Sequence, residues 1–177
     1  MKLFAKQILL PIIVLTAICL MCSSALAVTY KTTKPIIELE SAKEAAQARV
    51  MVYPGASDFV KLEGELPEGA TEVYTVNDGE GYVITASTKG FGGKIVVMTG
   101  ILTNGEVVGV KILSMDKETS GLGTQIDNDA YKAQYIGQSN VDAVPAISGA
   151  TVSSSAFKKL MQSVVAMPKQ LSGGATE

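Results

Sequence analysis

The 177-residue sequence contains no histidine and no tryptophan. Histidine is the usual general base near neutral pH and the commonest transition-metal ligand, so catalytic triads, cysteine–histidine pairs and histidine-based zinc sites are excluded. Only two cysteines occur, Cys19 and Cys22, and both lie in an apolar N-terminal stretch. The rest of the chain therefore has neither a disulfide nor a thiolate cluster. Redox chemistry in it would need an organic cofactor, and we expect no metal site.

The chain also lacks an excess of positive charge. It has 15 lysine and arginine residues against 17 aspartate and glutamate residues, a formal net charge of −2. Proteins that bind nucleic acid carry a basic patch or stripe on one face. We therefore expect no nucleic-acid partner.

The N-terminal stretch, residues 7–30, has no charged residue over 24 positions. At about 1.5 Å per residue it is long enough to span a hydrocarbon core of about 30 Å. The alternative is a cleaved signal peptide, for which Ala25-Leu26-Ala27 forms a suitable cleavage site. Both interpretations place the residues after Val28 outside the cytoplasm if the N-terminus, with Lys2 and Lys6, stays inside.

The remaining sequence predicts an α+β fold. An amphipathic helix is expected over residues 36–52, and turn residues dominate 57–70. Four strands are predicted, at 72–76, 82–87, 94–102 and 106–113. Thr103-Asn104-Gly105 separates the last two, and Asn-Gly between β-branched runs is a strong hairpin signal. We predict an antiparallel sheet with a β-hairpin and flanking helices, preceded by one N-terminal transmembrane helix.

Two further helices are predicted after the hairpin. A short helix is expected over residues 128–136, and apolar side chains recur at helical spacing over 153–166. Ser153 suits the N-cap of the second helix, and Pro168 is expected to end it. The predicted organisation is a membrane anchor or signal peptide (1–30), a helix and surface linker (31–70), a globular domain (71–170) and a flexible tail (171–177).

Three motifs carry functional information. Ser148-Gly149-Ala150-Thr151 lies just before the N-terminus of the last predicted helix, where backbone N–H groups and the helix dipole favour an anion. Glu118-Thr119-Ser120-Gly121-Leu122-Gly123 is a glycine-rich loop after the hairpin, and Lys89-Gly90-Phe91-Gly92-Gly93-Lys94 connects two strands. Taken alone, the first motif could be a helix cap, and the last could be a flexible connection.

Together, and in their order along the chain, the three motifs resemble the FMN-binding-domain family; the part of the resemblance that precedes the hairpin runs from Gly81-Tyr82 through Lys94. The resemblance covers roughly residues 79–166. Within the family it is greatest to the G subunit of the Rnf electron-transport complex, and the C subunit of the sodium-translocating NADH:quinone reductase is the close cousin. The loop departs from the family pattern at Ser120, which replaces a proline.

The resemblance implies one FMN per chain, attached to Thr151 through a phosphoester by a flavin transferase. Ser153, Ser154 and Ser155 are the alternative attachment sites. The motif residues Ser148, Gly149 and Ala150 accompany Thr151, and the resemblance places Glu118, Thr119, Gly121, Leu122 and Gly123 against the isoalloxazine ring. Glu118 could instead be structural and cap local backbone N–H groups.

One position departs from the pattern that flavin transferases recognise. They usually recognise an aspartate three residues before the Ser or Thr of the motif, where this chain has Pro145. The basic residues that would lie near the phosphate are not identified by the resemblance. Lys158 or Lys159 could lie there, although both could simply belong to a solvated helix face.

The implied function is electron relay within a membrane complex that couples electron flow between ferredoxin and NAD to ion translocation. The chain would have no catalytic residue of its own. Its partners would be the other membrane subunits, the flavin transferase and the membrane, with the folded domain outside the cytoplasm. The alternatives are a stand-alone covalent flavoprotein, the equivalent subunit of the quinone-linked pump, and a non-redox binding module of the envelope.

Overall fold

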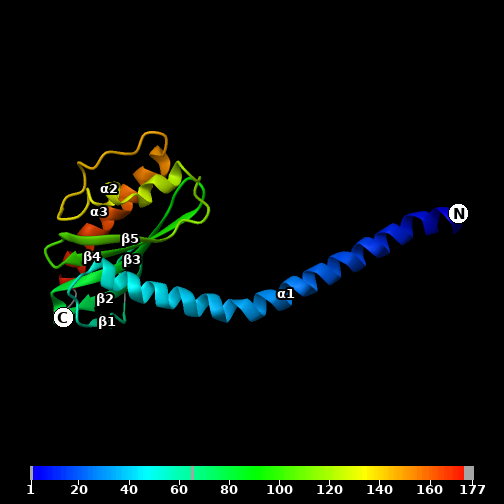
Figure 1. Ribbon diagram of the computed structural model, residues 1–177, viewed down its shortest axis with the longest axis horizontal. Coiled ribbons are helices and arrows are strands. Elements are labelled where there is room, and N and C mark those ends of the chain that lie inside the picture. The colour runs from blue at the N-terminus through cyan, green and yellow to red at the C-terminus, as the bar shows by residue number, and fades with distance from the viewer. Residues whose placement is uncertain (1, 65, 174–177) are drawn as a thin grey trace. The chain divides into compact units, whose positions relative to one another are not determined.

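The computed structural model describes residues 2–64 and 66–173, which form two compact units divided between Lys43 and Glu44. Helix α1 (Lys2–Val52) makes up the first unit and contributes its last residues to the second. The second unit contains a five-stranded sheet, helices α2 (Asp129–Lys132) and α3 (Thr151–Gly173), and the 3-10 helices η1 (Asn77–Gly79) and η2 (Gly123–Asp127) (Figure 1). The predicted α+β class is confirmed.

In the first unit, the side chains of α1 from Leu9 to Lys43 are exposed. Within the described residues, α1 is the one helix long and apolar enough to cross a membrane, and its most apolar window has a mean hydropathy of 2.4. This agrees with the predicted membrane segment in length and composition. The choice between an anchor and a signal peptide, and the domain boundaries at residues 30, 70 and 170, stay predictions.

Helix α1 is continuous through Pro35, whereas the sequence predicted a separate helix that begins at residue 36. A proline inside a helix removes one backbone donor and costs about 3 kcal/mol. The residues that follow are rich in alanine, glutamate and lysine, which favour a helix, and the helix does not break. Its predicted end is confirmed, because α1 stops at Val52 and Pro54 and Gly55 follow.

The sheet is an antiparallel meander in which strands adjacent in sequence are also adjacent in space. Its strands are β1 (Phe59–Lys61), β2 (Ala70–Val76), β3 (Gly81–Lys89), β4 (Lys94–Leu102) and β5 (Val107–Ser114). The predicted hairpin is confirmed, with Gly100 opposite Gly109 across β4 and β5. Gly105 in its turn has a φ of 89°, which favours glycine. Strand β1 was not predicted and lies in the turn-rich segment, where it pairs with β2.

Apolar side chains are buried on both faces of the sheet. Helix α3 covers one face with Phe157, Met161 and Val164, all almost fully buried. The other face is covered by Ala48 and Val52 from the end of α1. Because both faces are covered, β3 and β4 are buried nearly throughout, and the sheet is a rigid support for the loops at its edges.

Helix α3 differs from the prediction at both ends. The Ser154 N–H donates to the Ala150 carbonyl at 2.9 Å, so Ala150 is the cap residue and the predicted cap Ser153 is wrong. The helix also continues through Pro168 to Gly173. Met167 and Leu171 on either side of Pro168 pack against the core, and this burial offsets the lost hydrogen bond. Residues 171–173 of the predicted flexible tail are therefore helical, and 174–177 lie outside the described residues.

An aromatic cluster joins α3 to the chain around α2. Helix α2 is shorter than predicted and begins after Asn128, whose side chain accepts from the Ala130 N–H. Tyr135 packs edge-to-face against Phe157 with ring centroids 5.2 Å apart, and its hydroxyl lies 3.1 Å from that of Tyr131. Burial and the Tyr131 hydroxyl raise the pKa of Tyr135 above its ordinary value of 10.0, and burial also raises the pKa of Tyr131.

We expect Gly100→Ala to destabilise the fold by about 1–3 kcal/mol, the usual cost of overpacking. A Cβ at Gly100 would lie 2.1 Å from the Val52 carbonyl oxygen, and backbone cannot move aside cheaply. Urea unfolding followed by circular dichroism measures the effect. Val60→Ala is the control, because Val60 is 54% exposed on the edge strand β1. Equal stability of the two variants would show that α1 does not press on the sheet at Gly100.

We expect the stability of the protein to fall as pH rises above about 10, and Tyr135→Phe to reduce this fall. The folded-state pKa of Tyr135 lies above the unfolded value. The unfolded chain therefore ionises first, and stability present below pH 10 is lost above it. At neutral pH the variant costs about 0.5–1.5 kcal/mol through the lost hydrogen bond. Urea unfolding from pH 7 to 11 measures both effects, and parallel pH curves for wild type and variant would contradict the assignment.

Candidate functional site

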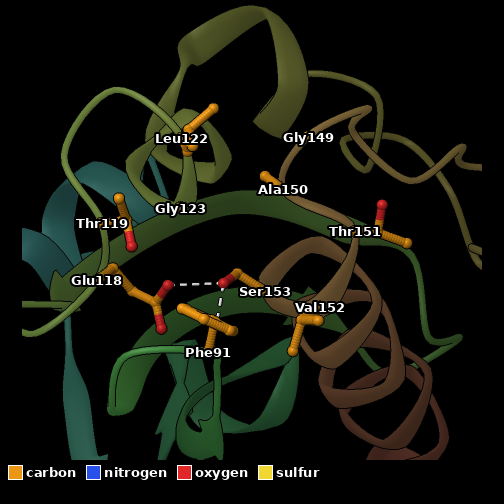
Figure 2. Close-up of a pocket in the computed structure, with 10 residues that line it drawn as sticks. All are labelled: Phe91, Glu118, Thr119, Leu122, Gly123, Gly149, Ala150, Thr151, Val152 and Ser153. Carbon is orange, nitrogen blue, oxygen red and sulfur yellow. Dashed lines mark hydrogen bonds between the residues drawn. The ribbon is translucent and has the colours of Figure 1, made fainter.

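Three segments that are distant in sequence meet around a cavity of about 330 Å³ in the second unit (Figure 2). They are the turn between β3 and β4, the loop after β5, and the start of α3. The lining residues are Phe91, Glu118, Thr119, Leu122, Gly123, Gly149, Ala150, Thr151, Val152 and Ser153. The three motifs of the sequence analysis therefore form one site.

The floor of the cavity is organised by the carboxylate of Glu118, which is only 8% exposed. Its Oε2 accepts a hydrogen bond from Ser153 Oγ at 2.6 Å, and its Oε1 accepts from the Gly92 N–H at 3.0 Å. Ser153 Oγ in turn accepts from the Phe91 N–H at 3.3 Å. One carboxylate thus ties all three segments together, and hydrogen bonds to a charged acceptor are among the strongest in proteins. The sequence offered Glu118 as a cap for local N–H groups, but the N–H that it binds belongs to Gly92, 26 residues away.

Glycines allow the backbone to approach this carboxylate closely. A Cβ at Gly90 would lie 2.2 Å from Glu118 Oε1, and a Cβ at Gly123 would lie 2.3 Å from Oε2. These distances are far below van der Waals contact, so any side chain at either position would displace the carboxylate. The glycine-rich turn is therefore a close-packed part of the site, and not the flexible connection that was the alternative interpretation.

The start of α3 directs its hydroxyl groups in different directions. Ser154 Oγ accepts from the Ile147 N–H at 3.0 Å and donates to the Ala150 carbonyl at 2.9 Å. Ser154 is fully buried and Ser153 nearly so, whereas Thr151 is exposed. Figure 2 shows the Thr151 side chain at the rim of the cavity, directed away from Glu118. The first backbone N–H groups of the helix, which have no intrahelical acceptor, lie beside it.

The rim of the cavity is apolar and open. Phe91, Val152 and Leu122 are 71%, 56% and 47% exposed. Large apolar side chains gathered around a concavity mark sites for ligands or partners. Three of them at one cavity suit a flat aromatic ring system, and the Glu118 network holds the backbone of Phe91 in place through Ser153.

Seven of the nine predicted site residues line the cavity: Glu118, Thr119, Leu122, Gly123, Gly149, Ala150 and Thr151. The other two, Ser148 and Gly121, are exposed and do not line it. Gly121 shapes the loop, with a φ of 79° and an N–H that donates to Thr124 Oγ1 at 3.0 Å. The role of each residue toward a cofactor stays a prediction.

Sequence reasoning did not select Phe91, Val152 and Ser153 as cavity residues. The sequence around Phe91 could have indicated its place, because a large apolar side chain between glycines in a turn has no neighbour there to pack against. Val152 and Ser153 directly follow the motif, but the predicted helix start was two residues too late to show which would face the cavity. Over residues 2–64 and 66–173, no group of three cysteine, aspartate or glutamate side chains is arranged to hold a metal ion.

Comparison with known proteins agrees with this geometry. Residues 90–166, which include every lining residue, match the family model of the FMN-binding domain. The chain is 25% identical over 174 residues to the G subunit of the proton-translocating ferredoxin:NAD⁺ oxidoreductase complex of Clostridium ljungdahlii. This alignment covers 90% of this chain and 91% of the relative.

Two further relatives carry related names. The chain is 28% identical to the G subunit of the ion-translocating oxidoreductase complex of Methanosarcina acetivorans, over 91% of this chain and 94% of the relative. It is 31% identical to the G subunit of the Na⁺-translocating ferredoxin:NAD⁺ oxidoreductase complex of Acetobacterium woodii, over 78% of this chain and 74% of the relative.

We expect Glu118→Ala to destabilise the protein by about 1–3 kcal/mol, because the buried Ser153 hydroxyl loses its acceptor, with a smaller loss at the part-buried Gly92 N–H. Glu118→Gln keeps one carbonyl acceptor and costs less. Urea unfolding gives the stability, and hydrogen exchange of the Gly92 amide reports the local bond. The control is Glu63→Ala at an exposed position, which should change stability by less than about 0.5 kcal/mol. An unchanged Gly92 exchange rate in Glu118→Ala would contradict the assigned network.

Proposed function

Because the chain belongs to the family of G subunits of ion-translocating oxidoreductase complexes, we propose that it is an FMN-carrying electron-relay subunit of such a complex. The relatives are subunits of ferredoxin:NAD⁺ oxidoreductase complexes that translocate protons or Na⁺. The match to the FMN-binding domain supports FMN as the cofactor. The partners of this chain are then the other membrane subunits of the complex.

The observation that carries the proposal is the cavity that joins the Glu118 loop to the start of α3. Its residues fit FMN on two counts. The exposed apolar side chains of Phe91, Leu122 and Val152 suit the flat ring system, and the exposed hydroxyl of Thr151 lies at the rim beside free helical N–H groups. When bound, FMN accepts and passes on electrons, while the protein sets its position and surroundings.

We infer that FMN is attached covalently, one per chain, through Thr151. In the proposed step, catalysed by a flavin transferase, the Thr151 oxygen attacks the phosphorus on the FMN side of FAD. The new bond is a phosphoester, the bond that breaks is in the pyrophosphate, AMP leaves, and the hydroxyl proton is released. The remaining negative charge is favoured at the helix N-terminus.

Burial supports Thr151 over the serines that follow it. Ser153 is 2% exposed and Ser154 is 0% exposed, and both hydroxyls are engaged in hydrogen bonds. A transferase cannot reach either without opening the helix start. Ser155 is half-buried and lies one helical turn further from the cavity. Of these four hydroxyl residues at the start of α3, Thr151 is the one that is exposed and lies on the rim.

A covalent tether suits a cavity as open as this one. Phe91 at the rim is 71% exposed, so a ring bound there stays accessible to redox partners, and a noncovalent cofactor would be lost on dissociation. A tether makes each rebinding event intramolecular and raises the effective concentration. The chain's residues then hold the ring in place and leave one side open for electron transfer.

We propose that the folded domain lies outside the cytoplasm, with α1 as a single membrane span. The apolar part of α1 supports membrane attachment. Lys2 and Lys6 precede the uncharged stretch of residues 7–30, and lysines near a membrane segment favour the cytoplasmic side. Outside the cytoplasm a noncovalent flavin that dissociates is lost by dilution, whereas a tethered flavin stays with the domain.

We expect Thr151→Ala to abolish covalent flavin attachment. The full chain is co-expressed with a flavin transferase, denatured, and examined for flavin fluorescence on the gel band and for intact mass. Wild type should be fluorescent, with the mass of one FMN ester, and the variant dark. Thr151→Ser should retain the label because it keeps a hydroxyl at the rim. Thr119→Ala is the matched control, since Thr119 lines the same cavity but lies away from the helix start.

Other outcomes have distinct meanings. A fluorescent Thr151→Ala chain would move the attachment to the following serines. A dark wild type that becomes fluorescent in Pro145→Asp would assign the defect to the departure at Pro145 from the usual transferase pattern. A chain that is dark in both forms would leave the motif as a helix cap and remove the covalent proposal.

A further inference from the structure

A second cavity, of about 470 Å³, lies next to Thr151 and Val152, which line both cavities. The other residues that line it are Thr88, Lys89, Ser155, Ala156 and Lys159. No acidic residue lines the cavity, and its five polar side chains, with that of Thr151 included, can all donate hydrogen bonds. Such a lining suits an anion.

The lining comes from one face of α3 and the end of β3. Thr151, Ser155 and Lys159 are spaced four residues apart, so they lie on one face of the helix. Lys159 is about 12 Å further along the helix axis than Thr151, and helical side chains tilt toward the N-terminus, which brings its ammonium group back toward Thr151. Lys89 is the last residue of β3 and approaches from the sheet side.

The side chains of the second cavity have no partner within the described part of the chain. No hydrogen bond or ion pair there involves the ammonium groups of Lys89 and Lys159 or the hydroxyls of Thr88, Thr151 and Ser155. Neighbouring Lys158 differs, because its Nζ donates to the Asp142 carbonyl at 2.6 Å. Of the two lysines considered from the sequence, the structure therefore leaves Lys159 available at Thr151 and commits Lys158 elsewhere.

We propose that Lys89 and Lys159 hold the phosphate of the flavin ester on Thr151, an inference that rests on the proposed function. The phosphodiester keeps one negative charge and two unesterified oxygens. Lysine binds phosphate as a compact point charge with rotatable donors, and the two lysines reach the cavity from different elements, β3 and α3. The second cavity is then the phosphate subsite, and the first cavity takes the ring.

The test records the phosphorus NMR resonance of the flavin phosphodiester in the full chain, flavinylated by co-expression and held in a phosphorus-free detergent. Lys89→Gln and Lys159→Gln should each move the resonance by more than its linewidth, because each removes a positive charge beside the phosphate. Lys159→Arg keeps the charge and should move it less. Lys158→Gln is the matched control at the adjacent position of α3 and should leave the resonance in place.

The outcomes separate this inference from the proposed function. A flavinylated chain whose resonance is the same in Lys89→Gln, Lys159→Gln and Lys158→Gln overturns the phosphate subsite and leaves the proposed function intact. A chain that takes up no covalent flavin, as wild type or as Pro145→Asp, overturns the covalent attachment itself. Unchanged thermal unfolding of the exposed-lysine variants shows that any shift reports the phosphate and not a damaged fold.

Discussion

The site depends on one buried carboxylate. Glu118 accepts hydrogen bonds from the glycine-rich turn and from the first turn of α3, at positions 26 and 35 residues away in sequence. A buried charge is costly unless it is fully hydrogen-bonded, so these bonds hold the three segments in one arrangement. Gly90 and Gly123 complete it, because any side chain there would collide with the carboxylate. These contacts fix the three segments that line the cavity.

The same network explains how consecutive hydroxyls at one helix start come to differ. Ser153 turns inward to Glu118, and Ser154 turns back to the preceding loop. Thr151, at the first helical position, points outward at the rim (Figure 2). Of the hydroxyls at the start of α3 that line this cavity, burial leaves Thr151 as the exposed one, between an apolar rim on one side and a lysine-lined cavity on the other. That arrangement matches the two chemical halves of a flavin nucleotide, a flat ring and a phosphate.

Much of the fold could be predicted from local patterns. The hairpin of β4 and β5 follows from Asn104-Gly105 between β-branched runs, and the buried face of α3 follows from its apolar spacing. The ends of helices were less predictable. Pro35 and Pro168 both lie inside helices. In α3 the packing of Met167 and Leu171 against the core offsets the backbone hydrogen bond that Pro168 cannot make.

By itself the sequence determined the α+β class, the apolar N-terminal segment and the three motifs, since strand alternation, hydrophobic length and short glycine-rich segments are all local properties. Only the tertiary structure decided that Phe91 shares a cavity with Thr151, that Glu118 is a buried acceptor for a distant turn, and that Lys159 rather than Lys158 lies beside the threonine. These facts depend on residues far apart along the chain: Glu118 accepts from Gly92, 26 positions away, and Lys89 and Lys159, 70 positions apart, line one cavity. Spacing along a chain does not determine which distant side chains meet; the packing of the sheet and α3 does.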